Sequence, residues 1–154
     1  MEKSTEIIKE TRVRFLNLMN DLSLDSLNKV PANFNNNIIW NFGHVIATQQ
    51  VLCYKLSNVH TKIGEEYITK YAKGTKPYLA VMKEEFDFLK KHALSTIEEL
   101  ETDFRSNVFN NFSPYTTSFG VRLNDITDSI KYVATHETLH LGYAMALKKL
   151  VQSR

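Results

Sequence analysis

Two histidines near the C-terminus, in the run His136-Glu137-Thr138-Leu139-His140, have a spacing that suits metal binding. On a helix, residues four apart lie one above the other on the same face, about 6 Å apart along the axis. One divalent metal ion can therefore accept a nitrogen from each ring. A chain of this composition would contain the pattern HExxH by chance only about once in a hundred cases. The spacing therefore predicts a metal site.

A catalytic metal ion usually has three protein ligands, so a third must come from elsewhere in the chain. The zinc metalloproteases that share HExxH take theirs from downstream of the motif, but residues 141–154 contain no His, Asp, Glu or Cys. The protease interpretation is therefore a motif match that lacks its third ligand. Upstream, His44 is the best candidate, because it follows Gly43, which permits close approach of a neighbouring segment. The alternative is that His44 fills a core position and bonds a backbone carbonyl.

The remaining candidates have weaker support. His60 and His92 are expected at surface or boundary positions, with His92 as the outside candidate for a fourth ligand. Glu137 is the candidate catalytic residue, since the glutamate of HExxH can act as a base. It points about 100° away from the face of its neighbour His136. It could instead hydrogen-bond a ligand histidine or be a charge on the helix surface, and all three interpretations remain open.

Helical periodicity dominates the chain, and no strand alternation competes with it. In the last helix both histidines stand on the apolar stripe, where two uncompensated imidazoles would be costly to bury. Thr75 is expected to cap the third helix, with Pro77 in its first turn, and residues 101–123 are expected to form a loop. The expected helices span about 4–22, 38–58, 75–100 and 124 or 127 to 151. Four amphipathic helices predict an all-α fold, a four-helix bundle.

Length and composition fit a single domain over residues 1–154. The chain is 43% hydrophobic with a net charge of +2, which is too small to indicate nucleic-acid binding. Its one cysteine, Cys53, excludes an internal disulfide framework and fits a reducing compartment. No apolar run is long enough to span a bilayer and no signal peptide is visible, so we expect a cytoplasmic protein that does not bind membranes.

Two segments of this sequence resemble the DinB/YfiT-like family of metal-dependent proteins. Asn37-Ile38-Ile39-Trp40-Asn41-Phe42-Gly43-His44 resembles the family's second-helix segment, and His136-Glu137-Thr138-Leu139-His140-Leu141-Gly142 resembles its fourth-helix HxxxH segment. The resemblance implies a four-helix bundle of up-down-down-up topology. It also implies that His44, His136 and His140 hold a divalent metal ion between helices two and four. Zinc, nickel and iron are the metals of that family, and its members are often homodimers.

The resemblance also suggests what the site does. Relatives include S-transferases that depend on a low-molecular-weight thiol and a mycothiol-dependent maleylpyruvate isomerase, whose extra C-terminal domain is not expected in this chain. The chain is therefore expected to be a metal-dependent enzyme acting on a small-molecule substrate, as a small-thiol-dependent S-transferase or a hydrolase. The alternative is a non-catalytic, metal-stabilised bundle for dimerisation or small-molecule binding. Three aromatic residues of the loop before the last helix could line a substrate mouth: Phe109, Phe112 and Tyr115.

Overall fold

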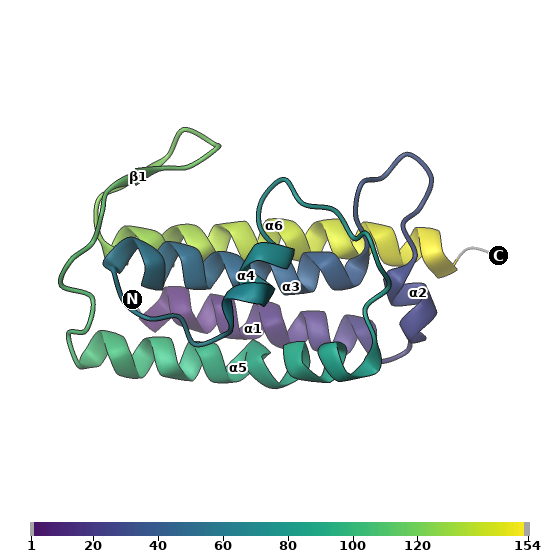
Figure 1. The fold of residues 1–154 in the computed structure, drawn as a ribbon, viewed down its shortest axis with the longest axis horizontal. Helices are drawn as coiled ribbons and strands as arrows, with labels where there is room; N and C mark the ends of the chain where they lie inside the picture. The colour runs from purple at the N-terminus through teal and green to yellow at the C-terminus, as the bar shows by residue number, and fades with distance from the viewer. Residues whose placement is uncertain (1, 153–154) are drawn as a thin grey trace.

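The computed structural model describes residues 2–152 and consists mainly of four long helices packed side by side (Figure 1). These are α1 (Glu2–Met19), α3 (Ile38–Gln49), α5 (Lys83–Arg105) and α6 (Ile126–Gln152). In Figure 1, α1 and α6 run in one direction, and α3 and α5 run in the other. The all-α four-helix bundle and its up-down-down-up topology are therefore confirmed.

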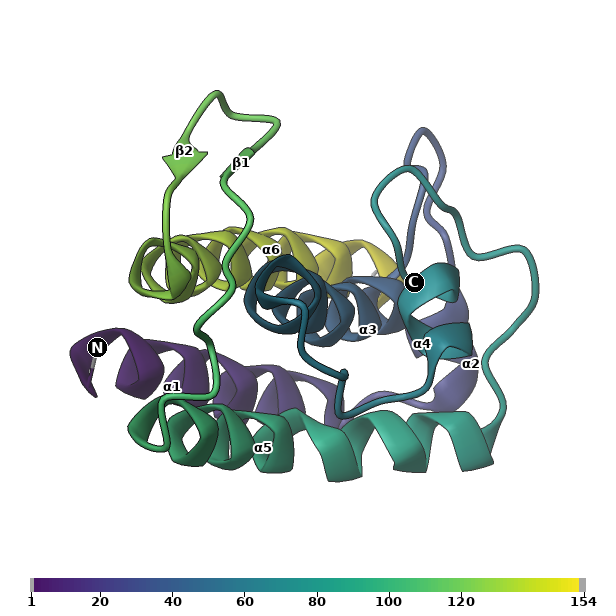
Figure 2. The same ribbon diagram turned by 60° about the vertical axis from the view of Figure 1, so that its left-hand side comes forward.

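The order of the helices around the bundle differs from their order in the chain. Each of α1 and α3 packs against both α5 and α6, so α1 and α3 lie diagonally opposite each other (Figure 2). The two helices that carry the predicted ligands, α3 and α6, are therefore direct neighbours, although the 76 residues from 50 to 125 lie between them in the chain. No helix within residues 2–152 is both long and apolar enough to cross a membrane.

The helix that carries His44 is the most buried of the four. Its N-cap is Asn37, whose side-chain oxygen accepts a hydrogen bond of 2.8 Å from the Trp40 amide. Its backbone continues beyond Gln49 as a π-helix (Gln50–Tyr54) and a 3₁₀ turn (Lys55–Ser57). The predicted segment 38–58 is therefore helical almost throughout, with a change of hydrogen-bond pattern in its second half.

The predicted start of the third long helix is wrong. Thr75 does not cap it, because its hydroxyl donates to the carbonyls of Lys70 and Ala72 (2.8 Å each). These bonds close the end of a short helix, α4 (Glu65–Lys70), which the sequence did not reveal. The long helix α5 begins only at Lys83 and extends to Arg105, five residues beyond the predicted end.

Two further elements lie outside the four long helices. A short helix, α2 (Leu24–Asn28), follows α1 and is capped by the Ser23 side chain. A two-stranded antiparallel hairpin, β1 (Tyr115–Thr116) with β2 (Arg122–Leu123), leads into α6 and stands away from the bundle (Figure 1). The expectation of a loop without strands was therefore wrong at this point. The hairpin and the segment between α4 and α5 lie at the edge of the bundle and border the site described below.

Candidate metal centre

The three histidines singled out in the sequence lie together between α3 and α6. His44 comes from α3, and His136 and His140 come from adjacent turns of α6. One nitrogen from each ring can be chosen so that all three lie within 4.8 Å of one another. The ring centroids are 4.5 to 5.2 Å apart. This group could hold a metal ion, since three imidazoles from facing helices can converge on one ion and leave further positions open.

The backbone of the α4–α5 connector orients His44. Its Nδ1 lies 2.7 Å from the carbonyl oxygen of Tyr71, which can only accept, so Nδ1 carries the proton. Nε2 is then the unprotonated nitrogen, and its lone pair accepts a hydrogen bond of 3.3 Å from the Thr48 hydroxyl. The Trp40 ring stacks on the imidazole at 4.7 Å with an interplanar angle of 11°. The ring of His44 is thus fixed in one tautomer and one plane, as a metal ligand requires.

Gly43 makes room for this contact. A Cβ atom at this position would lie 2.5 Å from Cδ1 of the Tyr71 ring, well inside van der Waals contact. The absence of a side chain therefore lets Tyr71 pack against α3 and place its carbonyl beside His44. The close approach of a neighbouring segment that Gly43 was expected to permit is therefore the contact with Tyr71.

Asn41 fixes the second imidazole. Its amide nitrogen donates to the backbone oxygen of Asn37 (2.7 Å) and to the side-chain oxygen of Asn36 (3.2 Å). The Asn37 carbonyl can only accept, so this contact sets the amide orientation and points Oδ1 at Nδ1 of His140, 2.8 Å away. His140 must then donate from Nδ1, which leaves its Nε2 lone pair free.

We therefore expect Asn41→Ala to weaken metal binding by about 10- to 100-fold, the usual cost of losing a partner that orients a ligand histidine. A chelator competition titration measures this change. Asn35→Ala is the matched control, because Asn35 is an exposed asparagine of the segment that leads into α3. Equal affinities in the wild type and Asn41→Ala would show that Asn41 does not orient a ligand.

His136 differs from the other two because its Nδ1 is buried and has no hydrogen-bond partner among the described residues. A buried polar atom without a partner is uncommon and calls for an explanation. The Tyr132 ring lies beside the imidazole at 6.0 Å and offers no hydrogen bond to it. The unsatisfied nitrogen fits a site completed by a group from outside the chain, such as a metal ion or a water molecule.

Burial lowers the pKa of all three histidines. The desolvation of the charged form is the largest cause in each case; it lowers the pKa of His44, that of His136 to about 3 and that of His140 to about 4. Repulsion between the neighbouring rings adds to the shifts of His136 and His140. At neutral pH the three rings are therefore uncharged, with lone pairs available to a metal ion.

These shifts predict a pH dependence for the metal-stripped protein. In the unfolded chain the histidines bind protons below about pH 6.5, whereas the folded chain resists protonation until the pH approaches the lowered values. The unfolded state thus binds more protons in this window, so the free energy of unfolding should fall as the pH is lowered from 7 towards 5. Denaturant titrations of the metal-stripped protein measure this change. His136→Leu should flatten the dependence, and an unchanged slope in that variant would contradict the assignment.

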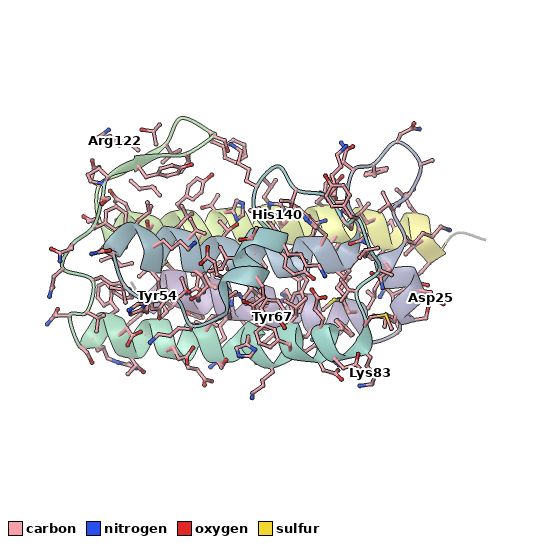
Figure 3. The ribbon with its side chains drawn as sticks, in the orientation of Figure 1. Asp25, Tyr54, Tyr67, Lys83, Arg122 and His140 are labelled. Carbon is pink, nitrogen blue, oxygen red and sulfur yellow. The ribbon has the colours of Figure 1, made fainter. Side chains whose placement is uncertain are left out.

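A cavity of about 480 Å³ opens over the triad. The three histidines form part of its lining, together with apolar side chains of α3 and α6 such as Trp40 and Leu139. Its outer wall comes from the β1–β2 hairpin and from the segment that follows α4. Figure 3 shows His140 on α6 and Arg122 on the hairpin, on the same upper side of the bundle in this view. The volume suits a small molecule.

Glu137 lies apart from this cavity, in the centre of the bundle. Both its oxygens accept hydrogen bonds from the Arg12 guanidinium, at 2.7 and 3.0 Å, and both side chains are fully buried. Arg12 also donates to the Ala93 carbonyl (2.9 Å) and the Thr96 hydroxyl (2.8 Å) of α5. Burial raises the pKa of Glu137, and the adjacent guanidinium opposes that shift. Glu137 is not a surface charge, and it is not among the residues that line the cavity.

Other sequence candidates lie elsewhere. His92, the outside candidate for a fourth ligand, bonds the Phe88 carbonyl through Nδ1 (2.8 Å) and is not part of the triad. Of the three aromatic residues expected at a substrate mouth, Tyr115 lines the cavity, whereas Phe109 is buried in the core and the partly buried Phe112 packs against it. Arg12 was missed as the partner of Glu137. The spacing Ile8, Arg12, Phe15 places a charge on an apolar helix face, which is the signal that could have revealed Arg12.

Comparisons with known proteins agree with this arrangement. The family model described as the DinB superfamily matches residues 7–144, which include all three histidines. A search of curated proteins finds no match to this chain.

Proposed function

The chain belongs to the DinB superfamily, and from that membership together with the histidine triad we propose that it is a metal-dependent enzyme acting on a small molecule. The observation that carries this proposal is the convergence of His44, His136 and His140 on one point at the base of a cavity. Zinc, nickel and iron all suit a set of three imidazoles. The proposed chemistry is S-transfer from a low-molecular-weight thiol, or hydrolysis.

Three nitrogens would hold the metal ion: Nε2 of His44, Nε2 of His140 and one nitrogen of His136. When bound, a divalent ion supplies a Lewis acid that lowers the pKa of a thiol or of water at an open position. The hydrogen bonds from His44 to Tyr71 and from His140 to Asn41 keep these rings in position. Trp40 and Leu139 give the cavity apolar surface beside the triad.

In the S-transfer that we propose, the atoms balance without an external oxidant or reductant. The thiol gives its proton to solvent, its sulfur forms a bond to an electrophilic carbon, and the leaving group departs with the bonding electrons. Among the residues that the structure describes, no carboxylate lines the cavity. Glu137 therefore has no direct access to the thiol proton. Its burial against Arg12 supports a structural role for Glu137 in place of the base role expected from the motif.

The test is a screen of protein loaded with zinc, nickel or iron, one metal at a time. Glutathione, bacillithiol, mycothiol and cysteine are each paired with an aromatic electrophile whose product absorbs light, and a chromogenic ester tests hydrolysis. We expect turnover with at least one combination and none in His140→Ala. Loaded protein that turns over no combination would contradict the enzyme proposal and favour the non-catalytic binding bundle.

A homodimer and a cytoplasmic location are part of the same proposal. Tyr143 and Leu150, two exposed apolar side chains seven residues apart on one face of α6, support a surface for self-association. The molecular mass in solution, measured by light scattering, should be twice that of the 17.8 kDa chain. A mass equal to that of one chain at micromolar concentration would contradict the dimer.

A further inference from the structure

The walls of the cavity over the triad differ in character. The inner walls from α3 and α6 are largely apolar and include Trp40, Val51 and Leu139. The outer wall contains hydroxyl groups of the hairpin, from Tyr115, Thr117 and Ser118, and the residues Ala72, Lys73 and Gly74 that follow α4. A ligand in this cavity therefore meets apolar surface on one side and polar groups on the other.

Lys73 is the one residue with a permanent charge among the described residues that line this cavity. Its side chain is exposed, and it makes no ion pair within residues 2–152. The lysine one turn earlier, Lys70, is held by Glu85 at 2.6 Å. With no carboxylate in the lining, nothing in the cavity neutralises the Lys73 ammonium group. A ligand with a negative charge would gain an attraction there that a neutral ligand would not.

Phe119, at the tip of the hairpin, adds an apolar contact to the outer wall. Its ring is 65% exposed, although it borders the cavity. One exposed aromatic residue on a surface means little by itself. Here the ring stands beside the opening, where an apolar body inside the cavity would cover part of it.

We propose that this cavity binds an amphipathic anion, a small molecule with an aromatic or aliphatic body and one carboxylate or similar group. Its body packs against Trp40, Leu139 and Phe119, and its anionic group pairs with Lys73 at the mouth. The inference rests on the proposed function in taking this cavity as the substrate site, and it names the class of substrate. Lys73 and Phe119 are the residues that determine specificity.

The experiment compares two probes of one shape, 4-phenylbutyrate and the neutral 4-phenylbutanamide. Trp40 is the only tryptophan of the chain and lines the cavity, so its fluorescence reports binding there. The titrations use the full chain, stripped of metal with a chelator, at low ionic strength. In the metal-stripped protein the carboxylate of phenylbutyrate cannot bind a metal ion. A tighter binding of phenylbutyrate than of the amide therefore reports the attraction of Lys73.

We expect the wild type to bind phenylbutyrate about fivefold more tightly than the amide, a preference that should shrink as salt is added. Lys73→Met should remove the preference without weakening amide binding. Phe119→Ser should weaken both probes about equally. Lys76→Met is the matched control, because Lys76 is an exposed lysine of the same connector that does not line the cavity, and it should behave as the wild type.

Equal affinities for the two probes in the wild type, a preference that survives in Lys73→Met, or no binding of either probe would each overturn the inference. Metal content is measured on the same preparations before stripping. If the protein binds metal but shows no preference for the anionic probe, only the inference about the substrate class is contradicted. If the protein takes up no metal, the proposed function is contradicted, and the probe titration still tests the inference.

Discussion

Alanine at His44, His136 or His140 is expected to leave the protein without bound metal. Each substitution removes one of three converging nitrogens, and two imidazoles seldom hold a catalytic metal ion. The loss of affinity should exceed the ~10- to 100-fold that follows from losing a partner which only orients a ligand. The three variants should therefore lose metal together, although they lie on two helices.

The measurement is metal content by plasma mass spectrometry after dialysis, on untagged protein. The wild type should hold about one metal ion per chain, which is what one histidine triad can accommodate. His92→Ala is the matched control, because His92 is a partly buried histidine that bonds a carbonyl of its own helix. A triad variant that retains the wild-type content would remove that histidine from the ligand set. A wild type that takes up no metal after reconstitution would contradict the site as a whole.

The largest loss of stability is expected from Arg12→Met. This change leaves the Glu137 carboxylate buried without its partner, and it also removes the hydrogen bonds to Ala93 and Thr96. Breaking one side of a buried ion pair costs about 3–5 kcal/mol. We expect the free energy of unfolding in urea to fall by about that amount. A fall below about 1 kcal/mol would show that the pair contributes little to the fold.

A double variant separates the cost of the unpaired charge from the value of the pair. Arg12→Met with Glu137→Leu removes both charges, and such replacements are often neutral or stabilising. We expect the double variant to recover most of the stability that Arg12→Met loses. Its far-ultraviolet circular dichroism should match that of the wild type, which controls for a change of fold.

Glu137→Gln tests the role of this residue in the chemistry. Because Glu137 lies between the two histidines of α6 and bonds α1 through Arg12, the pair fixes the rotation of α6 and hence the direction of both imidazoles. If this positioning is its role, the variant should lose stability while keeping about one metal ion per chain and the activity of the folded protein. Full metal content with activity abolished would restore the base interpretation.

Local patterns in the sequence were sufficient for the main architecture. The apolar periodicity predicted four long helices, and the segment 38–58, which is apolar around most of its circumference, contains the most buried of them. The spacing of His136 and His140 placed both on one face of a helix without any knowledge of the fold. The choice of His44 as the candidate third ligand needed only the preceding Gly43 and the absence of a ligand downstream of His140. Apart from that choice, these inferences depend on residues close together in the chain.

The errors arose where distant contacts override local signals. Thr75 and Pro77 look like the start of a helix, yet the Thr75 hydroxyl bonds the end of α4, and α5 begins at Lys83. The short strands of the hairpin have two residues each, which is too few for a periodic pattern to detect. Phe109 was expected at a pocket mouth, but it packs against Tyr54 in the core.

The sequence alone determined the four long helices, the bundle class and the three candidate histidines, because helical periodicity and i, i+4 spacing are local properties. Only the tertiary structure decided which ring nitrogens carry the proton, since the partners of His44 and His140 are a backbone carbonyl and an amide whose orientation depends on packing. It also decided that Glu137 pairs with Arg12, 125 residues away, and that Lys73 is the one permanently charged residue among the described residues that line the cavity. These contacts depend on which faces of the helices pack against one another. That packing is determined by the burial of apolar side chains from the whole chain, not by any local pattern.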